Sequence, residues 1–75
     1  MRDNKFTYEI IKNLGVLSAS NDGRFQIEAN IISYNGTAPK LDVRKWDKEK
    51  NRFLKGIVLT RPEAEALRDI LVKSL

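Results

Sequence analysis

The amino-acid sequence predicts an α+β domain in which a four-stranded antiparallel sheet is followed by one helix. Three observations predict this fold: four extended segments of apolar residues, turn residues between them, and a capping motif before a final helical periodicity. The chain has 75 residues. All these elements therefore belong to a single small domain, residues 1–75.

The first two predicted strands, residues 9–18 and 24–34, flank a turn. That turn, Ser20-Asn21-Asp22-Gly23, is rich in residues that tolerate positive φ. Gly15, inside the first strand, suits a bend or bulge. The second strand alternates cleanly, so we expect one of its faces to be core, formed by Phe25, Ile27, Ala29 and Ile31. The opposite, polar face carries Asn30 and ends in Ile32 and Tyr34.

The third predicted strand, residues 40–46, carries charged and aromatic side chains on one face. It follows an Asn35-Gly36 turn and cannot start much earlier because of Pro39. Residues two apart on a strand point the same way. Lys40, Asp42, Arg44 and Trp46 therefore share one face, opposite Leu41 and Val43 on the predicted core side.

The fourth predicted strand, residues 53–59, leaves the direction of one lysine open. Ile57 and Leu59 are expected in the core, which by alternation would also bury Lys55. A bulge at Gly56 would instead re-aim this side chain.

A helix is predicted over residues 61–74. Thr60 and Glu63 have the spacing of a capping box, and Pro62 suits the first helical turn. The apolar stripe of this helix is expected to cover the core face of the sheet and to leave area for a second subunit. We expect the dimer interface to contain Leu67, Ile70, Leu71 and Leu75.

The composition argues against catalysis. The chain has no Cys and no His, so it lacks thiolate nucleophiles, the usual general base and the usual zinc ligands. No acidic pair or Gly-rich phosphate loop is evident, and we expect no enzyme activity, cofactor, metal or small-molecule substrate. The charged N-terminus lacks a signal sequence, and no apolar run could span a membrane. We therefore expect a cytoplasmic protein that does not bind membranes.

The surplus positive charge is concentrated in residues 40–55. This segment contains seven Lys or Arg and three Asp or Glu. Its surplus of four positive charges equals the formal net charge of +4 of the whole chain. Clustered cations attract phosphates at any sequence, and the only tryptophan, Trp46, lies among them. Nucleic acid is the first candidate partner.

Several side chains are candidates for contact with nucleic acid. Lys40 and Arg44 are expected to meet phosphates, and Trp46, flanked by them on a solvent-side face, to stack on a base. Tyr34, Lys55 and Asn30 complete the set. The simpler alternatives are that Trp46 is core, that Tyr34 packs on a cross-strand partner, and that Lys48, Lys50 and Arg52 form a solvated hairpin tip.

The second half of the chain resembles a known family. Leu41-Asp42-Val43-Arg44-Lys45-Trp46, a charged hairpin, Lys55-Gly56-Ile57-Val58-Leu59-Thr60 and a helix with an acidic start resemble the C-terminal domain of the transcriptional positive cofactor four family. These are single-stranded-DNA-binding coactivators. Gly15-Val16-Leu17-Ser18 and Ile31-Ile32-Ser33-Tyr34-Asn35-Gly36 resemble its bacterial branch.

The resemblance implies a homodimer of curved sheets, with the helices at the dimer core and each sheet forming a groove for one strand. Arg44, Trp46, Lys55 and Tyr34 match the family's DNA-contacting positions, and Lys40 matches more loosely. The chain has one aromatic after Arg44 where eukaryotic members often have two, and it lacks their Ser-rich tail.

Residues and resemblance together predict a non-enzymatic, largely sequence-independent single-stranded-DNA-binding homodimer. Its setting would be transcription regulation or replication and repair, in the bacterial cytoplasm and associated with the nucleoid. Two alternatives remain at this point: an RNA-binding protein, or an interaction module that binds an acidic protein partner.

Overall fold

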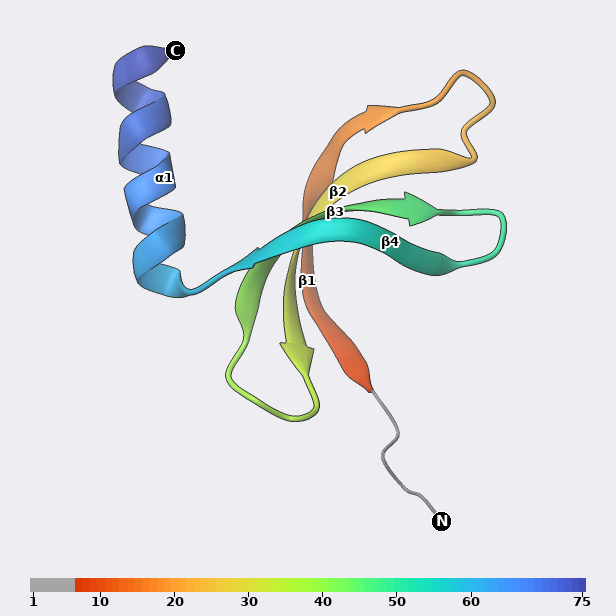
Figure 1. The fold of residues 1–75 in the computed structure, drawn as a ribbon, viewed down its shortest axis with the longest axis horizontal. Coiled ribbons are helices and arrows are strands. Elements are labelled where there is room, and N and C mark those ends of the chain that lie inside the picture. Colours follow the sequence, from red (N-terminus) through yellow and green to blue (C-terminus); the bar gives the residue numbers. More distant parts are fainter. Residues whose placement is uncertain (1–6) are drawn as a thin grey trace.

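The computed structural model describes residues 7–75 as one sheet followed by one helix (Figure 1). The elements are β1 (Tyr8–Ala19), β2 (Phe25–Tyr34), β3 (Lys40–Asp47), β4 (Arg52–Leu59) and α1 (Arg61–Ser74). The strands lie in the order β1-β2-β3-β4, and all neighbours are antiparallel. The predicted α+β fold is confirmed. Residues 1–6, on which the expectation of no signal sequence partly rests, lie outside the described residues.

Strand β1 contains three irregularities where one was expected. Its register against β2 shifts between Ile10 and Lys12, between Asn13 and Gly15, and between Val16 and Ser18. Each shift inserts one extra residue into β1, and the extra residues are Ile11, Leu14 and Leu17. Because every bulge bends its strand and increases the local twist, three bulges in one strand curve the whole sheet strongly.

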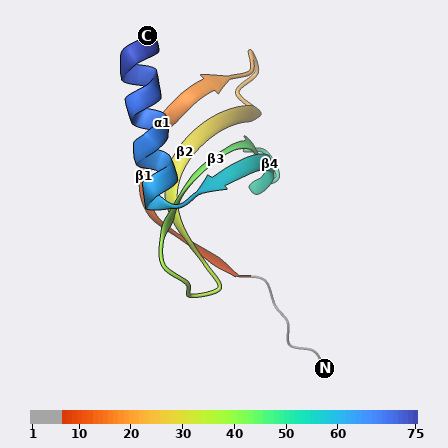
Figure 2. The same ribbon diagram turned by 60° about the vertical axis from the view of Figure 1, so that its left-hand side comes forward.

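The curvature brings the two edge strands together across the concave face of the sheet. The ring of Tyr8, at the start of β1, lies 5.3 Å from the ring of Phe53 in β4, centroid to centroid. Figure 2 shows the bend from the side. Within residues 7–75, Ile32 and Trp46 are the buried hydrophobic residues, and both lie on this concave face. The small core of the chain is therefore inside the curl.

This arrangement reverses the prediction of which sheet face is buried and which is exposed. The expected core face is exposed in part, because Ile27 and Ile57 are 37% and 55% exposed. The opposite face, expected to be open, holds the buried Asn30, Asp42 and Trp46. Alternation grouped the side chains into two faces correctly, but the bulges of β1 decide which face is enclosed.

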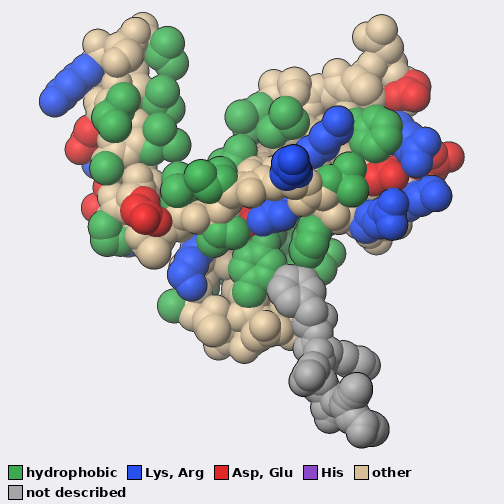
Figure 3. Space-filling view, in the orientation of Figure 1, with side chains coloured by type: hydrophobic (Ala, Val, Ile, Leu, Met, Phe, Trp, Pro, Cys, Tyr) green, Lys and Arg blue, Asp and Glu red, His purple; other side chains and the backbone are tan. Residues whose placement is uncertain are grey.

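Helix α1 stands beside the sheet instead of covering it (Figure 1). Among the described elements its backbone approaches only β3 and β4, and none of its residues is buried. In Figure 3, hydrophobic side chains line the side of α1 that faces the sheet, across an open notch. A groove of about 590 Å³ lies between them, lined by residues that include Leu14, Ile31, Leu41 and Ala64. Among the described residues, no helix is long and apolar enough to cross a membrane.

The predicted capping box is present at the start of α1. The backbone N–H of Glu63 donates to the Thr60 hydroxyl at 3.4 Å, and the Thr60 N–H donates to the Glu63 carboxylate at 2.9 Å. This second bond lowers the pKa of Glu63. Arg61 and Glu65 form an i,i+4 ion pair at 3.0 Å. Local interactions thus stabilise a helix that has little packing against its own sheet.

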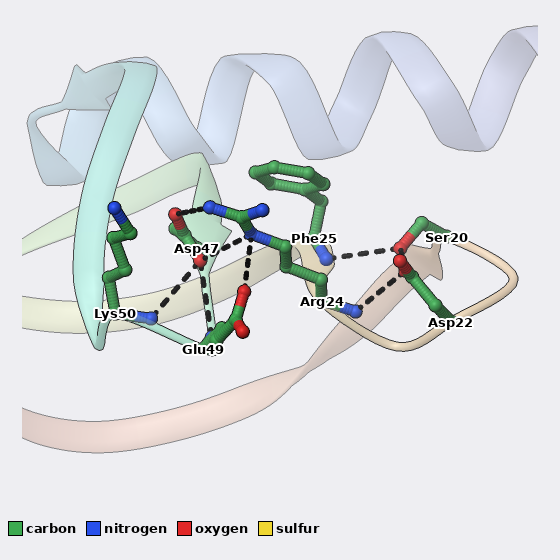
Figure 4. Close-up of polar contacts among 7 residues, drawn as sticks. All are labelled: Ser20, Asp22, Arg24, Phe25, Asp47, Glu49 and Lys50. Atoms are coloured by element: carbon green, nitrogen blue, oxygen red, sulfur yellow. Dashed lines mark hydrogen bonds and ion pairs between the residues drawn. The ribbon is translucent and has the colours of Figure 1, made fainter.

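An arginine holds the β1–β2 and β3–β4 hairpins together (Figure 4). Arg24 donates from Nε and from a terminal nitrogen to Asp47 at 3.2 and 3.1 Å, and it also pairs with Glu49 at 3.1 Å. The Asp47 carboxylate further accepts from the backbone N–H groups of Glu49 and Lys50. The hydrogen bond from Arg24 is the main reason that the pKa of Asp47 is lowered to about 2. Asp47 therefore stays ionised in the folded chain where an unpaired aspartate would be protonated.

The lack of a side chain at Gly56 in β4 allows Arg44 of β3 to approach closely. Gly56 lies opposite Arg44 in the register, just after a bulge at Leu54 and Lys55. A Cβ atom at Gly56 would overlap Cβ of Arg44 and lie 2.7 Å from the Val43 carbonyl oxygen. The contact involves sheet backbone, which cannot rotate away. Glycine at this position is thus a packing requirement.

We expect Gly56→Ala to destabilise the fold by about 3 kcal/mol, because β3 and β4 must separate to admit the methyl group. Gly36→Ala is the matched control: Gly36 has φ +76° but nothing within 4 Å of the added atom. It should cost only about 1 kcal/mol, from backbone strain. Urea unfolding followed by circular dichroism measures both. Equal losses in the two variants would contradict the packing argument.

The lowered pKa of Asp47 predicts a loss of stability in acid. Since the folded value is about 2 and the ordinary value is 3.8, the stabilisation is present above pH 3.8 and disappears as the pH falls to about 2. Urea midpoints across this range should fall less steeply in Asp47→Asn than in the wild type. Asp69→Asn, which removes an exposed carboxylate of α1, should keep the wild-type slope. A wild-type slope in Asp47→Asn would show that this pair is not responsible.

Candidate nucleic-acid interface

Four aromatic rings gather on the concave face of the sheet. Tyr8 lies at the centre of the cluster: its centroid is 6.3 Å from that of Tyr34, 6.2 Å from Trp46 and 5.3 Å from Phe53. Trp46 and Phe53 meet edge to face at 5.7 Å. Such tilted and edge-to-face contacts are the favourable geometry for aromatic pairs. We call these four residues the aromatic cluster.

Two cations lie against rings of the aromatic cluster. The Arg44 guanidinium carbon is 4.9 Å from the Phe53 centroid, and Lys48 Nζ is 5.6 Å from the Trp46 centroid. Lys48 also forms an ion pair at 2.9 Å with Glu28, which is nearly buried. The aromatic cluster is therefore joined to the basic segment of residues 40–55 by direct contacts.

Arg44 is held by groups of its own chain. Its guanidinium makes a two-pronged contact with Asp42, Nε to Oδ1 at 2.8 Å and a terminal nitrogen to Oδ2 at 2.7 Å, and it donates to the Leu54 carbonyl at 2.9 Å. Its side chain is 12% exposed. The hydrogen bond to Asp42 raises the pKa of Arg44. Arg44 thus fixes β3 against β4 and supports the Phe53 ring, which leaves little of it for a phosphate.

Tyr34 reaches the same carboxylate from β2. Its hydroxyl donates to Asp42 Oδ2. Burial, and then this hydrogen bond, raise the pKa of Tyr34 to about 12, so the hydroxyl remains protonated at any physiological pH. Asp42 is fully buried, and both of its oxygens accept hydrogen bonds from Arg44 or Tyr34. Asp42 therefore connects Tyr34 of the aromatic cluster to Arg44 of β3 through hydrogen bonds.

Asn30 is in the interior, not on a contact surface. It is 0% exposed, accepts from Asn13 Nδ2 at 2.7 Å, and donates to Glu28 Oε1 at 3.5 Å. Asn13 is its cross-strand neighbour in β1. The expectation that Asn30 is accessible is wrong, because the curl of the sheet encloses the concave face on which it lies.

Trp46 is also buried, at 3% exposed. The expectation of an open ring on a solvent-side face is wrong, because Tyr8 from one edge strand and Phe53 from the other cover it. The simpler alternative, that Trp46 is a core residue, describes the chain correctly. Tyr34 is half-buried within the same cluster.

The two lysines among the predicted contacts remain accessible. Lys40 is half-buried where it lines the groove beside α1, together with Arg61 and Arg68. Lys55 is exposed in the β4 bulge. A bulge that re-aims Lys55 is present just before Gly56, so Lys55 does not point into the core.

Tyr8 and Phe53 are members of the cluster that the sequence reasoning did not select. Tyr8 lies one residue before the predicted start of the first strand, and Phe53 begins the predicted fourth strand. An aromatic residue at the end of each edge strand was the available signal. It could be used only with the curvature known, because an open sheet would place these residues far apart.

Among residues 7–75, no three acidic side chains lie close enough together to hold a metal ion, and the chain has no Cys or His. The candidate site as described consists of rings, amides and ion pairs. This set suits non-covalent binding of a ligand that has both flat apolar surface and negative charge.

Comparison with known proteins identifies a relative without assigning a function. No family model matches the chain. A protein of Treponema pallidum (strain Nichols), described as uncharacterized, is 46% identical over 66 residues, which cover 88% of this chain and 76% of the relative. Identity at this level over most of both chains reflects common ancestry and a shared fold. The chain belongs to the same family as this Treponema pallidum protein.

Proposed function

We propose that the protein binds single-stranded DNA as a homodimer, without catalysis and largely independently of sequence. The observation that carries this proposal is the aromatic cluster, two of whose rings, Trp46 and Phe53, belong to the segment 40–55 that holds the surplus charge. Rings supply a stacking surface for any base, and cations track the phosphate backbone. Unpaired bases are needed because the bases of a duplex are already stacked.

The structure changes which residues are assigned to each role. The stacking surface begins with Tyr8, which is 39% exposed, and continues into the half-buried Phe53 and Tyr34. Trp46 supports these rings from beneath. Five cations of the basic segment form no ion pair among the described residues. One of them, Lys45, lies 4.9 Å from the centroid of the Phe25 ring. Phosphate contacts are assigned to the other four: Lys40, Lys50, Arg52 and Lys55. Arg44 becomes a positioning residue instead of a phosphate contact.

A second copy of the chain is the proposed cover for the apolar surfaces. The helix stripe is exposed, with Leu67, Ile70 and Leu71 at 37%, 58% and 43%, and the convex sheet face is exposed beside it. The radius of gyration is 14.0 Å, whereas a compact domain of this length would have about 11 Å. An extended subunit with two adjoining apolar surfaces is suited to an obligate two-fold dimer.

The proposed dimer suggests the cellular processes in which the protein acts. Two identical sites and a doubled positive charge suit the two separated strands of a melted duplex, which occur in transcription regulation and in replication and repair. The protein would then act in the bacterial cytoplasm in association with the nucleoid. Competition between oligo-dT and oligo-U of equal length separates DNA from RNA as the ligand, since the 2′-hydroxyl and the thymine methyl are the groups that differ.

Binding of oligo-dT should weaken with salt, with a log–log slope of about −0.7 for every phosphate contacted. Lys55→Ala should make this slope shallower by about 0.7, because it removes one such contact. Lys73→Ala, in the last turn of α1, removes the same charge away from the aromatic cluster and should leave the slope unchanged. Fluorescence anisotropy of labelled oligo-dT across a salt series measures both. Absence of binding at low salt would refute the proposed function.

Ile70→Asp should convert the dimer into monomers, because it places a carboxylate in the exposed stripe of α1. Sedimentation equilibrium should give twice the chain mass for the wild type and a concentration-dependent fall to one mass in the variant. Lys73→Asp adds a carboxylate to the same helix outside the stripe and should remain dimeric. A monomeric wild type at micromolar concentration would contradict the assigned interface.

A further inference from the structure

The indole N–H of Trp46 is a buried donor with no acceptor. Among residues 7–75, Trp46 Nε1 is the one buried side-chain nitrogen or oxygen that lacks a hydrogen-bond partner. Trp46 itself is 3% exposed. Buried polar groups are nearly always satisfied, so a lone exception calls for an explanation. A phenylalanine would provide an apolar aromatic ring here without an unsatisfied N–H, so a buried donor at this place points to an acceptor that comes from outside the chain.

One ring beside Trp46 is more exposed than the others of the aromatic cluster. Tyr8 lies 6.2 Å from Trp46 and, at 39% exposed, is the most exposed ring of the cluster. Its backbone is anchored next door: the Thr7 N–H donates to Asn35 Oδ1, and the Asn35 N–H donates to the Thr7 carbonyl, both at 2.9 Å. Outward rotation of the Tyr8 side chain would leave these backbone hydrogen bonds of Thr7 intact. Phe53 is less exposed and carries Arg44 against its ring.

The surroundings of Trp46 favour a neutral acceptor over a phosphate. Glu28 is buried, and its carboxylate pairs at 2.9 Å with Nζ of Lys48, the cation that lies against the Trp46 ring. A phosphate brought to the indole would thus meet a paired lysine and a buried carboxylate. A base edge carries no charge and provides carbonyl oxygens that accept from N–H groups.

We propose that an incoming nucleobase displaces the Tyr8 ring, stacks in the aromatic cluster and accepts a hydrogen bond from Trp46 Nε1 through an exocyclic carbonyl oxygen. This inference rests on the proposed single-strand binding. It adds a subsite for one base and the group of the base that this subsite recognises, a carbonyl oxygen. Thymine, uracil, cytosine and guanine carry such a carbonyl, and adenine does not. The subsite therefore prefers carbonyl-bearing bases within an otherwise sequence-tolerant interface.

The single tryptophan makes the donor directly visible. A ¹⁵N-labelled wild-type protein has one indole N–H resonance, which reports on Trp46 alone. Saturation with oligo-dT should shift the indole proton downfield, as expected when a hydrogen bond forms. An abasic oligomer of equal length, which has the same phosphates and no bases, should leave it in place. A resonance that does not move on saturation with oligo-dT overturns the subsite.

Affinity measurements with a shape mimic test the carbonyl itself. Oligomers in which difluorotoluene replaces thymine keep the shape and stacking surface but accept hydrogen bonds poorly. The wild type should bind oligo-dT about 3- to 10-fold more tightly than this mimic. In Trp46→Phe, which lacks the N–H, the difference should vanish. An equal preference in both proteins overturns the hydrogen bond, and the wild-type comparison stands even where the variant folds poorly.

The role of Tyr8 as the displaced ring has its own measurement. Acrylamide should quench Trp46 fluorescence more strongly in Tyr8→Ala than in the wild type, and Tyr8→Phe, which keeps the ring, should behave as the wild type. Equal quenching in all three proteins overturns the displacement. Failure of the wild type to bind any oligomer refutes single-strand binding itself. Binding without an indole shift and without discrimination against the mimic refutes only the subsite.

Discussion

The contact between Tyr8 and Phe53 is the interaction on which the concave face depends. These residues lie on opposite edge strands, and their rings meet only because three bulges bend β1. The closed curl then removes Trp46 and Ile32 from water and gives a chain of 75 residues its core. Among residues 7–75, two buried hydrophobic side chains are few for a folded domain. The remaining apolar area lies on the convex face and on α1, where it is available to a neighbouring molecule.

Charged groups occupy much of the space that hydrophobic residues would fill in a larger core. Asp42 and Asp47 are 0% and 2% exposed, and each is matched by an arginine with a two-pronged contact. Ion pairs that bury a carboxylate contribute little net stability, because desolvation offsets the attraction, but breaking one leaves an unpaired buried charge. They therefore fix geometry more than they add stability. The Asp42 network holds β3 to β4, and the Asp47 network holds the two hairpin loops in place.

The sequence was sufficient to predict the strands and the helix, but not to predict which face of the sheet is buried. Alternation, the turns at 20–23 and 35–36, and the Thr60 capping box predicted four strands and a helix with limits within two residues of those observed. Parity also assigned side chains to shared faces correctly, as with Asp42, Arg44 and Trp46. Which face is inside depends on the bulges at Ile11, Leu14 and Leu17, and these follow from long-range register that local propensity does not encode. Both misplaced site residues, Asn30 and Trp46, share this cause, as does the omission of Tyr8.

The same bulges have a consequence for how the exposed sheet avoids uncontrolled association. Strand β1 is an edge strand rich in isoleucine, leucine and valine, the composition that usually templates the addition of a foreign strand. Because its ladder is interrupted every third residue from Ile10 to Ser18, it cannot offer a long, flat row of evenly spaced amides and carbonyls. The bulges that bend the sheet around its core therefore also make this edge strand a poor template for the strand pairing by which fibrils grow.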